Sequence, residues 1–499
     1  MPPTRSCPRL IRVNRRGCFA VHDSRMSALR LATPFTPGAP RFDRELLARY
    51  DVSGPRYTSY PTAPQFHGGF GEAEFRAVAR ASNEEPIPAP LSLYVHVPFC
   101  PNPCFYCGCT RIITRDAARP VAYVDQLARE IEHVAPLFDR DREVTQLHFG
   151  GGTPNVLAAA DFGRLMHGLR NHFTLSRASA REFGIEVDPR LATPTDIARF
   201  AALGFNRLSL GIQDFDADVQ RAVNRVQGVA PTRDLLEAAH RHGFRSTSVD
   251  LIYGLPLQTP ERFARTLDLV IAMQPRRIVT YAYAHLPDRF PAQRRIARHA
   301  LPDPATRLRL LELAVERLVT AGYAYIGMDH FALPGDDLAA ARRDGSLQRN
   351  FQGYSTHARS DLIGLGMSAI SHVGASFSQN ARDAESYARA LDAGHLPIVR
   401  GLALDGDDLI RADVIQQLMC NEALDMDRLG DRHHIDFRTY FAAALERLAT
   451  LAADGLVSLG PAHIMVEARG RLMLRNVAMC FDRYLDAPQA AATRYSKTI

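Results

Sequence analysis

Apolar residues in the middle of the chain fall into short continuous runs, each followed by a stretch with the spacing of an amphipathic helix. The strand-like runs are Leu91–Val97, Thr145–Phe149, Phe183–Val187, Arg207–Gly211, Thr247–Ile252 and Ile278–Tyr283. The helical stretches between them are Val121–Phe138, Asp161–Phe173, Pro194–Leu203, Thr232–His242 and Glu261–Met273. Alternation of this kind is typical of βα units in a parallel sheet. The pattern therefore predicts an α/β fold, an incomplete parallel (β/α)6 barrel.

The pattern changes after about residue 395. Helical stretches at Ile410–Leu424 and Tyr440–Asp454 are followed by a strand-like finish through Leu472–Arg475. We therefore predict a small, mainly helical C-terminal domain over residues 396–499, following a catalytic barrel over residues 91–395.

The N-terminal part of the chain lacks a clear period. Residues 46–90 are expected to form an arm that covers the active site. Residues 1–45 are irregular and rich in arginine, with few acidic residues to balance them. We expect them to be disordered or to precede the true start of the protein, for which Met26 is a candidate.

Composition excludes several classes of protein. The chain is 46% hydrophobic and 23% charged, as in ordinary globular proteins, and no apolar run approaches the roughly 20 residues of a membrane helix. The net charge of +6 is scattered along the chain, so we expect no nucleic-acid partner. Eight cysteines are too few for a disulfide scaffold in a chain this long, which favours a reducing, cytoplasmic location.

Four of these cysteines are crowded into the stretch HVPFCPNPCFYCGC, directly after the first predicted strand. Cys100, Cys104 and Cys107 have the spacing C-x3-C-x2-C. Three thiolates can hold three irons of a cubane cluster and leave the fourth iron open for an exogenous ligand. The alternative is a structural zinc site with Cys109 as fourth ligand, although structural zinc usually takes its ligands from two separated pairs.

This spacing, with the aromatic residue Tyr106 before the third cysteine, resembles the motif of the radical S-adenosylmethionine superfamily. In that superfamily S-adenosylmethionine chelates the open iron of a 4Fe–4S cluster, and an electron from the cluster splits the cofactor to release a 5′-deoxyadenosyl radical. The resemblance implies that Cys100, Cys104 and Cys107 are the cluster ligands. The run HFGGGTP after the second predicted strand resembles the segment that binds the methionyl amino group.

A broader resemblance runs from SGPRYTSYPT at residue 53 to MCFDRYL near the C-terminus, and includes GMDHFALP and RNFQGY. These segments are similar to the oxygen-independent coproporphyrinogen III oxidases. The resemblance implies that two propionates of coproporphyrinogen III are decarboxylated to vinyl groups, giving protoporphyrinogen IX, and that two S-adenosylmethionine molecules are used. The cofactor-binding residues that it implies are Tyr94, Tyr106, Gly151, Gly152, Thr153, Glu186, Gln213, Arg225, Asp250, Ala284 and Ile370.

Two features favour an oxidase over the alternative of a haem chaperone with the same fold. Cys109 and the segment Gly54–Thr62 resemble the oxidases and are typically missing from the chaperones. Besides Cys109, the candidate catalytic residues are Arg56, a clamp for substrate carboxylates, and His96, a hydrogen-bonding partner of the cluster or cofactor. A surface arginine and a packed strand histidine remain equally open interpretations. We expect an external electron donor and acceptor, and a monomer.

Overall fold

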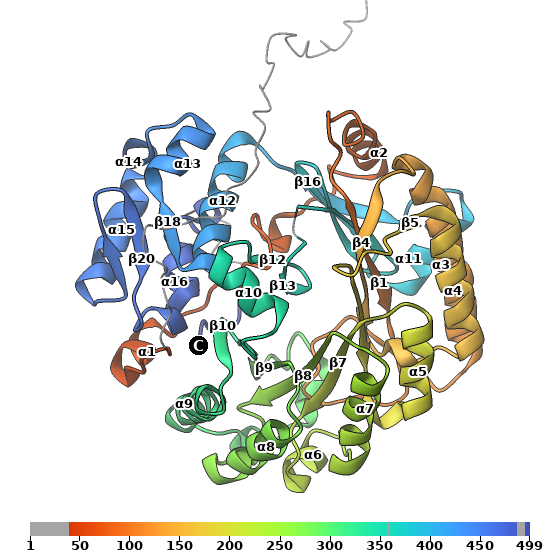
Figure 1. The fold of residues 1–499 in the computed structure, drawn as a ribbon, viewed down its shortest axis with the longest axis horizontal. Coiled ribbons are helices and arrows are strands. Elements are labelled where there is room, and N and C mark those ends of the chain that lie inside the picture. The colour runs from red at the N-terminus through yellow and green to blue at the C-terminus, as the bar shows by residue number, and fades with distance from the viewer. Residues whose placement is uncertain (1–38, 358, 487–494) are drawn as a thin grey trace, which may run out of the picture.

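The computed structural model describes residues 39–357, 359–486 and 495–499, and is built around one large sheet of 13 strands (Figure 1). The six predicted strands are present and lie side by side in chain order, each parallel to the next. They are β1 (Leu91–Val97), β4 (Glu143–Gly151), β6 (Glu182–Val187), β7 (Arg207–Gln213), β8 (Ser246–Tyr253) and β9 (Arg277–Ala282). The parallel sheet predicted from the sequence is therefore confirmed.

Helices connect these strands and cover the outer face of the sheet (Figure 1). Their hydrophobic sides pack into a core that includes Phe149, Phe162 and Phe263, each at most 2% exposed. Several begin at a threonine or aspartate followed by proline, which caps the first turn and fixes its backbone. The helices are α3 (Ala118–Val134), α4 (Ala159–His172), α5 (Pro194–Ala202), α6 (Ala217–Ala222), α7 (Val229–Arg241), α8 (Pro260–Ala272) and α9 (Pro304–Thr320).

Both edges of the parallel region carry further strands that the sequence pattern did not predict. Beside β9 lie the antiparallel strands β11 (His330–Ala332) and β10 (Ala324–Gly327). Beside β1, β14 (Asp361–Leu365) is parallel and continues into an antiparallel meander. The meander consists of β15 (Ile370–Val373), β16 (Ser376–Asn380) and β17 (Ile398–Ala403). Among the described residues the strand order ends at β10 and β17, so the barrel is open.

The C-terminal domain lies beside the barrel, with α10 (Asp337–Asp344) and the hairpin of β12 (Gln348–Asn350) and β13 (Gly353–Ser355) between them (Figure 1). A small antiparallel sheet, β18-β20-β19, completes it. Its elements are α12 (Gly406–Asn421), β18 (Ala423–Asp425), α13 (Met426–His433), α14 (Phe437–Tyr440), α15 (Ala442–Ala453), β19 (Val457–Leu459), β20 (His463–Val466) and α16 (Leu474–Met479).

The predicted strand-like finish at Leu472–Arg475 is wrong. The chain forms a 3₁₀ turn at Arg471–Met473 and then α16. Residues Leu474–Ala478 are all buried, the polar Arg475 and Asn476 included, so the segment has no exposed face. Without an exposed face, so short a run does not distinguish a strand from a buried helix. In addition, β17 pairs with β16 of the large sheet, which therefore extends past the predicted boundary at residue 395.

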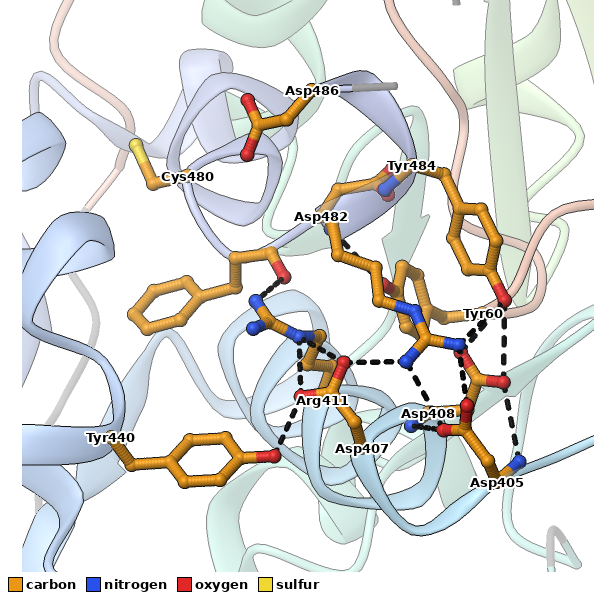
Figure 2. A network of polar contacts seen from close by, with 12 residues as sticks. Tyr60, Asp405, Asp407, Asp408, Arg411, Tyr440, Cys480, Asp482, Tyr484 and Asp486 are labelled. Atoms are coloured by element: carbon orange, nitrogen blue, oxygen red, sulfur yellow. Dashed lines mark hydrogen bonds and ion pairs between the residues drawn. The ribbon is translucent and has the colours of Figure 1, made fainter. Parts of the chain in front are cut away.

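The arm contains α1 (Arg44–Tyr50) and α2 (Glu72–Ala81), and its middle part is held by the C-terminal domain. A polar network surrounds Asp405, Asp407 and Asp408 (Figure 2). In this network Arg483 donates to Asp405 Oδ2 at 2.8 Å and to Asp407 Oδ2 at 2.7 Å. Its guanidinium also lies 3.0 Å from Asp408 Oδ1. The backbone N–H of Arg483 donates to Tyr60 Oη at 3.2 Å. The network thus ties the arm to the first turn of α12. Of the predicted N-terminal extension, residues 1–38 lie outside the described residues.

Candidate active site

The cysteine loop lies at the carboxyl end of β1. Cys100 ends a short strand, β2 (Phe99–Cys100), which pairs with β3 (Ile112–Ile113) on the far side of the loop. The backbone N–H of Phe105 donates to Val223 O at 2.9 Å, and Asn224 Nδ2 donates to Pro103 O at 2.7 Å. The loop is therefore attached at its base and in its middle, which places the cysteines where active sites of barrels of this type are found.

Two arginines approach the sulfur of Cys104, which is 8% exposed. Arg225 Nη1 lies 3.5 Å and Arg190 Nη2 lies 3.7 Å from Cys104 Sγ. Both guanidinium groups are held by the carboxylate of Asp188, at 3.1 Å from Arg225 and 2.6 Å from Arg190. Positive N–H groups beside a sulfur stabilise its thiolate form, the form that binds iron.

The remaining loop cysteines interact with one another and with the glycine run. The hydrogen bond from the Cys109 thiol lowers the pKa of Cys107 to about 6, and donating that bond raises the pKa of Cys109. The backbone N–H of Cys109 also lies 3.4 Å from Cys107 Sγ. Burial raises the pKa of Cys100 to about 11, against the hydrogen bond with Thr153 Oγ1 at 3.3 Å.

The glycine run follows β4 and lies against the cysteine segment. A Cβ atom on Gly152 would lie 2.7 Å from the backbone of Pro98, and one on Gly151 would lie 2.6 Å from Cε1 of His96. Gly151 also has φ +114°, which side chains rarely adopt. Gly152 is therefore required by the close approach of the Pro98 backbone, and Gly151 by its positive φ and the nearby His96 ring.

A chain of polar side chains runs across the neighbouring strands from β1 to β6. Tyr94 Oη and His96 Nδ1 are 3.1 Å apart, and His96 Nε2 lies 3.0 Å from Thr110 O. Both ring nitrogens of His96 thus have protein partners, so a hydrogen bond to a ligand would replace one of them. Glu186 is 3.1 Å from His148 Nε2 and accepts from the backbone N–H of Gly151 at 3.2 Å. Burial opposes the charge of Glu186, but these hydrogen bonds bring its pKa below the ordinary value.

Other predicted cofactor-binding residues border the same end of the sheet. Burial raises the pKa of Asp250 to about 7, and Ser209 Oγ donates to its carboxylate at 3.3 Å. Gln213 ends β7 with φ +68°. Ile370 begins β15, and its backbone lies against Gly364, the residue paired with Tyr94.

Sequence reasoning missed three residues of this region. Asp188 and Arg190 follow Glu186 in the stretch IEVDPR, so the polar residues just beyond a strand end were an available signal. Gln293 Nε2 donates to Tyr106 O at 3.0 Å and to Ala284 O at 3.2 Å, and so ties the cysteine loop to the segment after β9. Nothing in the sequence near Gln293 points to that role.

A cavity of about 720 Å³ lies beside this segment. Its lining includes Ala284 and the charged residues Arg56, Arg307, Asp329 and Arg475. Arg56, from the arm, is paired with the carboxylate of Asp329, and its guanidinium lies 5.7 Å from the ring centroid of Tyr281. Arg56 is thus at the barrel mouth, as a substrate clamp requires, although in this structure its charge is already engaged by Asp329.

The donor set suits an iron–sulfur cluster. Cys100, Cys104 and Cys107 are free cysteines on one loop, and the sulfur of Cys104 faces two guanidinium groups. In the described part of the chain, no three histidine, cysteine, aspartate or glutamate side chains converge on one metal ion. The thiolates of a cubane bind separate irons and need no such convergence.

Comparisons with known proteins agree with this geometry. The family model described as the radical SAM superfamily matches residues 94–270, and the model described as the HemN C-terminal domain matches residues 404–473. No helix in the described ranges has the length and apolar character needed to cross a membrane.

Two curated relatives are described as oxygen-independent coproporphyrinogen III oxidases. The protein of Pseudomonas aeruginosa is 50% identical over 459 residues, covering 92% of this chain and 99% of that protein. The Escherichia coli protein is 47% identical, over 92% of this chain and 98% of its own. The solved structure of coproporphyrinogen III oxidase (HemN) from Escherichia coli, described as a radical SAM enzyme, has a TM-score of 0.85 and 46% identity, and covers 90% of this chain and 100% of that one. The chain therefore belongs to the oxygen-independent coproporphyrinogen III oxidase family of the radical SAM superfamily, which implies an iron–sulfur cluster and S-adenosylmethionine as cofactors.

Proposed function

We propose that the chain converts coproporphyrinogen III to protoporphyrinogen IX without oxygen. One observation carries the assignment of the site: the cysteine loop and an arginine-bordered cavity meet at Ala284, through the two hydrogen bonds of Gln293. A substrate in the cavity thereby lies next to the radical source. The substrate has four carboxylates, which arginine pairs with in bidentate fashion.

When bound, the cluster and S-adenosylmethionine would supply a 5′-deoxyadenosyl radical as the acceptor of a β-hydrogen atom from a propionate. Conversion of that propionate to a vinyl group would then release carbon dioxide and one electron, which goes to the external acceptor. Cys100, Cys104 and Cys107 would hold the cluster, and Arg190 and Arg225 would donate N–H groups to the sulfur of Cys104. The glycine run and Glu186 face the methionyl end of the cofactor.

The remaining assignments complete the proposal. The cofactor is bound by Tyr94, Tyr106, Gln213, Asp250, Ala284 and Ile370. Because these residues are spread around the strand ends, we propose that they bind two S-adenosylmethionine molecules. Arg56 holds a substrate carboxylate, and the arm, residues 46–90, excludes water from the barrel mouth. The enzyme takes an electron from an external donor and passes one to an external acceptor. We further propose a cytoplasmic monomer with a domain boundary near residue 403, at the end of β17.

The test is an anaerobic assay on cluster-reconstituted protein with coproporphyrinogen III, S-adenosylmethionine and a reductant. We expect protoporphyrinogen IX, two molecules of carbon dioxide per product, and 5′-deoxyadenosine. The same reaction without the porphyrinogen controls for uncoupled cofactor cleavage. Haem binding with no decarboxylated product would overturn the proposal in favour of a haem chaperone.

A further inference from the structure

A second cavity, of about 360 Å³, lies behind the arm, between the β12–β13 hairpin, the meander and α12. Part of its wall is aromatic. His372 stacks on Phe377 with ring centroids 4.3 Å apart, and Phe351 meets Phe377 edge-on at 5.8 Å. Tyr57 and Tyr60 of the arm close the other side. Walls of this kind suit an aromatic ring such as a pyrrole.

Arg349 is the unusual residue of this wall. It is 7% exposed, and its Nε and Nη1 find no hydrogen-bond partner within the described ranges. Its guanidinium carbon lies 4.8 Å from the ring centroid of Tyr354, and within the described part of the chain Arg349 forms no ion pair. A buried cation with unpartnered N–H groups is costly unless an anion joins it.

The charges around Arg349 do not balance. Asp329 is 9% exposed, and its carboxylate is paired with Arg56. Burial opposes its charge, but Arg56 first, and then His330, Arg349 and Arg475, lower its pKa. All three arginines therefore act on the charge of Asp329, but only Arg56 is ion-paired with it.

Arg475 is satisfied in another way. It is 4% exposed, and its guanidinium donates to Pro55 O at 2.8 Å, to Lys497 O at 2.7 Å and to Gly54 O. Arg56 has Asp329 and Arg475 has three carbonyls, so Arg349 is the guanidinium left to receive an anion.

The second cavity adjoins the candidate active site. Ile370 and His372 are two residues apart on β15, so their side chains lie on the same face of the strand. Tyr57, in the cavity wall, directly follows Arg56, which lines the larger cavity. A molecule bound at Arg349 would therefore border the cofactor-binding end of the sheet.

We propose that Arg349 binds a propionate carboxylate of the tetrapyrrole substrate, with the attached pyrrole ring against the aromatic wall. The inference rests on the proposed function, because the larger part of the substrate must occupy the barrel mouth. It adds a subsite on the far side of the arm, where a propionate is held while another is at the radical source.

The test uses coproporphyrin III, the stable oxidised form of the substrate, and its tetramethyl ester, which lacks the charges. Both are titrated into the anaerobic, cluster-containing protein with S-adenosylmethionine present. We expect wild-type protein to bind the acid more tightly than the ester. Arg349→Gln should reduce that preference about tenfold, or ~1.4 kcal/mol, while Arg349→Lys should keep more of it because the charge remains.

Two further variants support the interpretation. Ala412→Trp fills the same cavity from α12 without removing a charge, and should weaken binding of acid and ester alike. Arg389→Gln is the matched control, because Arg389 is an exposed arginine of α11 (Ala384–Asp392), paired only with Glu385 in the recorded contacts; it should bind as wild type does.

The outcomes separate the two proposals. Wild-type protein that binds the acid no more tightly than the ester would overturn this inference, while the anaerobic product assay tests the proposed function separately. Wild-type discrimination that persists in Arg349→Gln would overturn the inference alone. Arg349→Gln could instead lose about tenfold in affinity for S-adenosylmethionine while still preferring the acid to the ester. That result would assign Arg349 to the carboxylate of the cofactor and would also overturn the inference.

Discussion

Cys104 differs from the other loop cysteines in its surroundings, since two arginines lie within 3.7 Å of its sulfur. Cys109, by contrast, contacts Cys107 through its backbone N–H and its thiol. The sulfur of Cys104 therefore has arginine N–H groups as neighbours, whereas Cys109 forms hydrogen bonds to another loop cysteine, Cys107. This difference leads to opposite expectations for their substitution.

Cys104→Ala should abolish cluster assembly and all cleavage of S-adenosylmethionine, because only two of the three ligands would remain. Cys109→Ala should still assemble the cluster. Iron and sulfide per chain, with the electronic absorption of anaerobically reconstituted protein, measure both. Iron content in Cys104→Ala equal to wild type would contradict the ligand assignment.

Glu130, outside the candidate active site, allows the effect of a buried carboxylate on the stability of the fold to be tested. It is 1% exposed and accepts hydrogen bonds from Tyr387, Asn380 and the backbone of Gly366, each at 2.6 Å. Burial nevertheless raises its pKa from 4.5 to about 7. A carboxyl group with a raised pKa in the folded state costs the fold stability as the pH rises from its unfolded pKa to its folded one.

Glu130→Gln, which cannot ionise, should therefore gain stability relative to wild type between pH 5 and 7.5, by up to about 3 kcal/mol. The measurement is the difference in Tm between variant and wild type across this range. Glu132→Gln, an exposed change on the same helix, should show a constant difference. The interpretation fails if the Glu130→Gln difference is equally flat.

For single residues, the sequence predicted a functional role where the residue belongs to a motif with a characteristic spacing. The spacing of Cys100, Cys104 and Cys107 was sufficient to predict a cluster site. The contacts of Arg190 with Cys104 and of Gln293 with Tyr106 escaped prediction because the two partners lie 86 and 187 residues apart in the sequence. Such contacts are determined by the tertiary fold, which no local spacing reveals.

The turn after β4 is an element whose shape is set by close backbone approach. Gly152 donates to Val97 O at 2.8 Å, and its Cα faces the backbone of Pro98 and Phe99. Since backbone atoms cannot move aside as a flexible side chain can, a methyl group here must displace the start of the cysteine loop.

Gly152→Ala should therefore lower the iron content and the affinity for S-adenosylmethionine, and reduce the Tm. Gly163→Ala is the matched control, because Gly163 lies within α4 and a Cβ atom there meets nothing within 4 Å. Removing a helical glycine should stabilise the chain by about 0.5–1 kcal/mol. Equal iron content and cofactor affinity in the two variants would refute the packing argument.

Elements with a clear period were predicted well, and the others were not. The parallel strands and their helices occur where the pattern placed them. Each βα unit has a buried apolar strand followed by a helix with one buried face, and both leave a clear pattern in the sequence. The meander β15–β17 and helix α16 were missed or misassigned, since short edge strands and a helix buried on all sides have no distinctive period.

Across the whole molecule, a buried ionic cluster joins barrel and C-terminal domain. Glu422, at the end of α12, is 0% exposed and lies 2.6 Å from Arg342 of α10 and 2.8 Å from Arg471. Arg471 Nη2 in turn donates to Tyr325 O in β10, at 3.2 Å. One carboxylate therefore balances two buried guanidinium groups from different parts of the fold.

Glu422→Gln should destabilise the protein by about 3–5 kcal/mol, because it leaves two buried cations without their anion. A fall in Tm of several degrees, together with earlier proteolysis between barrel and C-terminal domain, is the expected result. Glu385→Gln, at an exposed pair on α11, should change the stability by at most about 0.5 kcal/mol. A Tm within one degree of wild type in Glu422→Gln would contradict the role of the cluster.

The hydrogen bonds of Arg475 to the arm and to Lys497 are accompanied by a main-chain bridge in which Thr498 N–H donates to Val52 O at 2.7 Å. Residues near the two ends of the described chain thus share one wall of the larger cavity. This wall therefore forms only when segments from opposite ends of the described chain have met, whereas the cysteine loop is closed locally by the pairing of β2 with β3. A change that loosens the contact between residues 495–499 and the arm should consequently open the cavity without altering the cysteine loop.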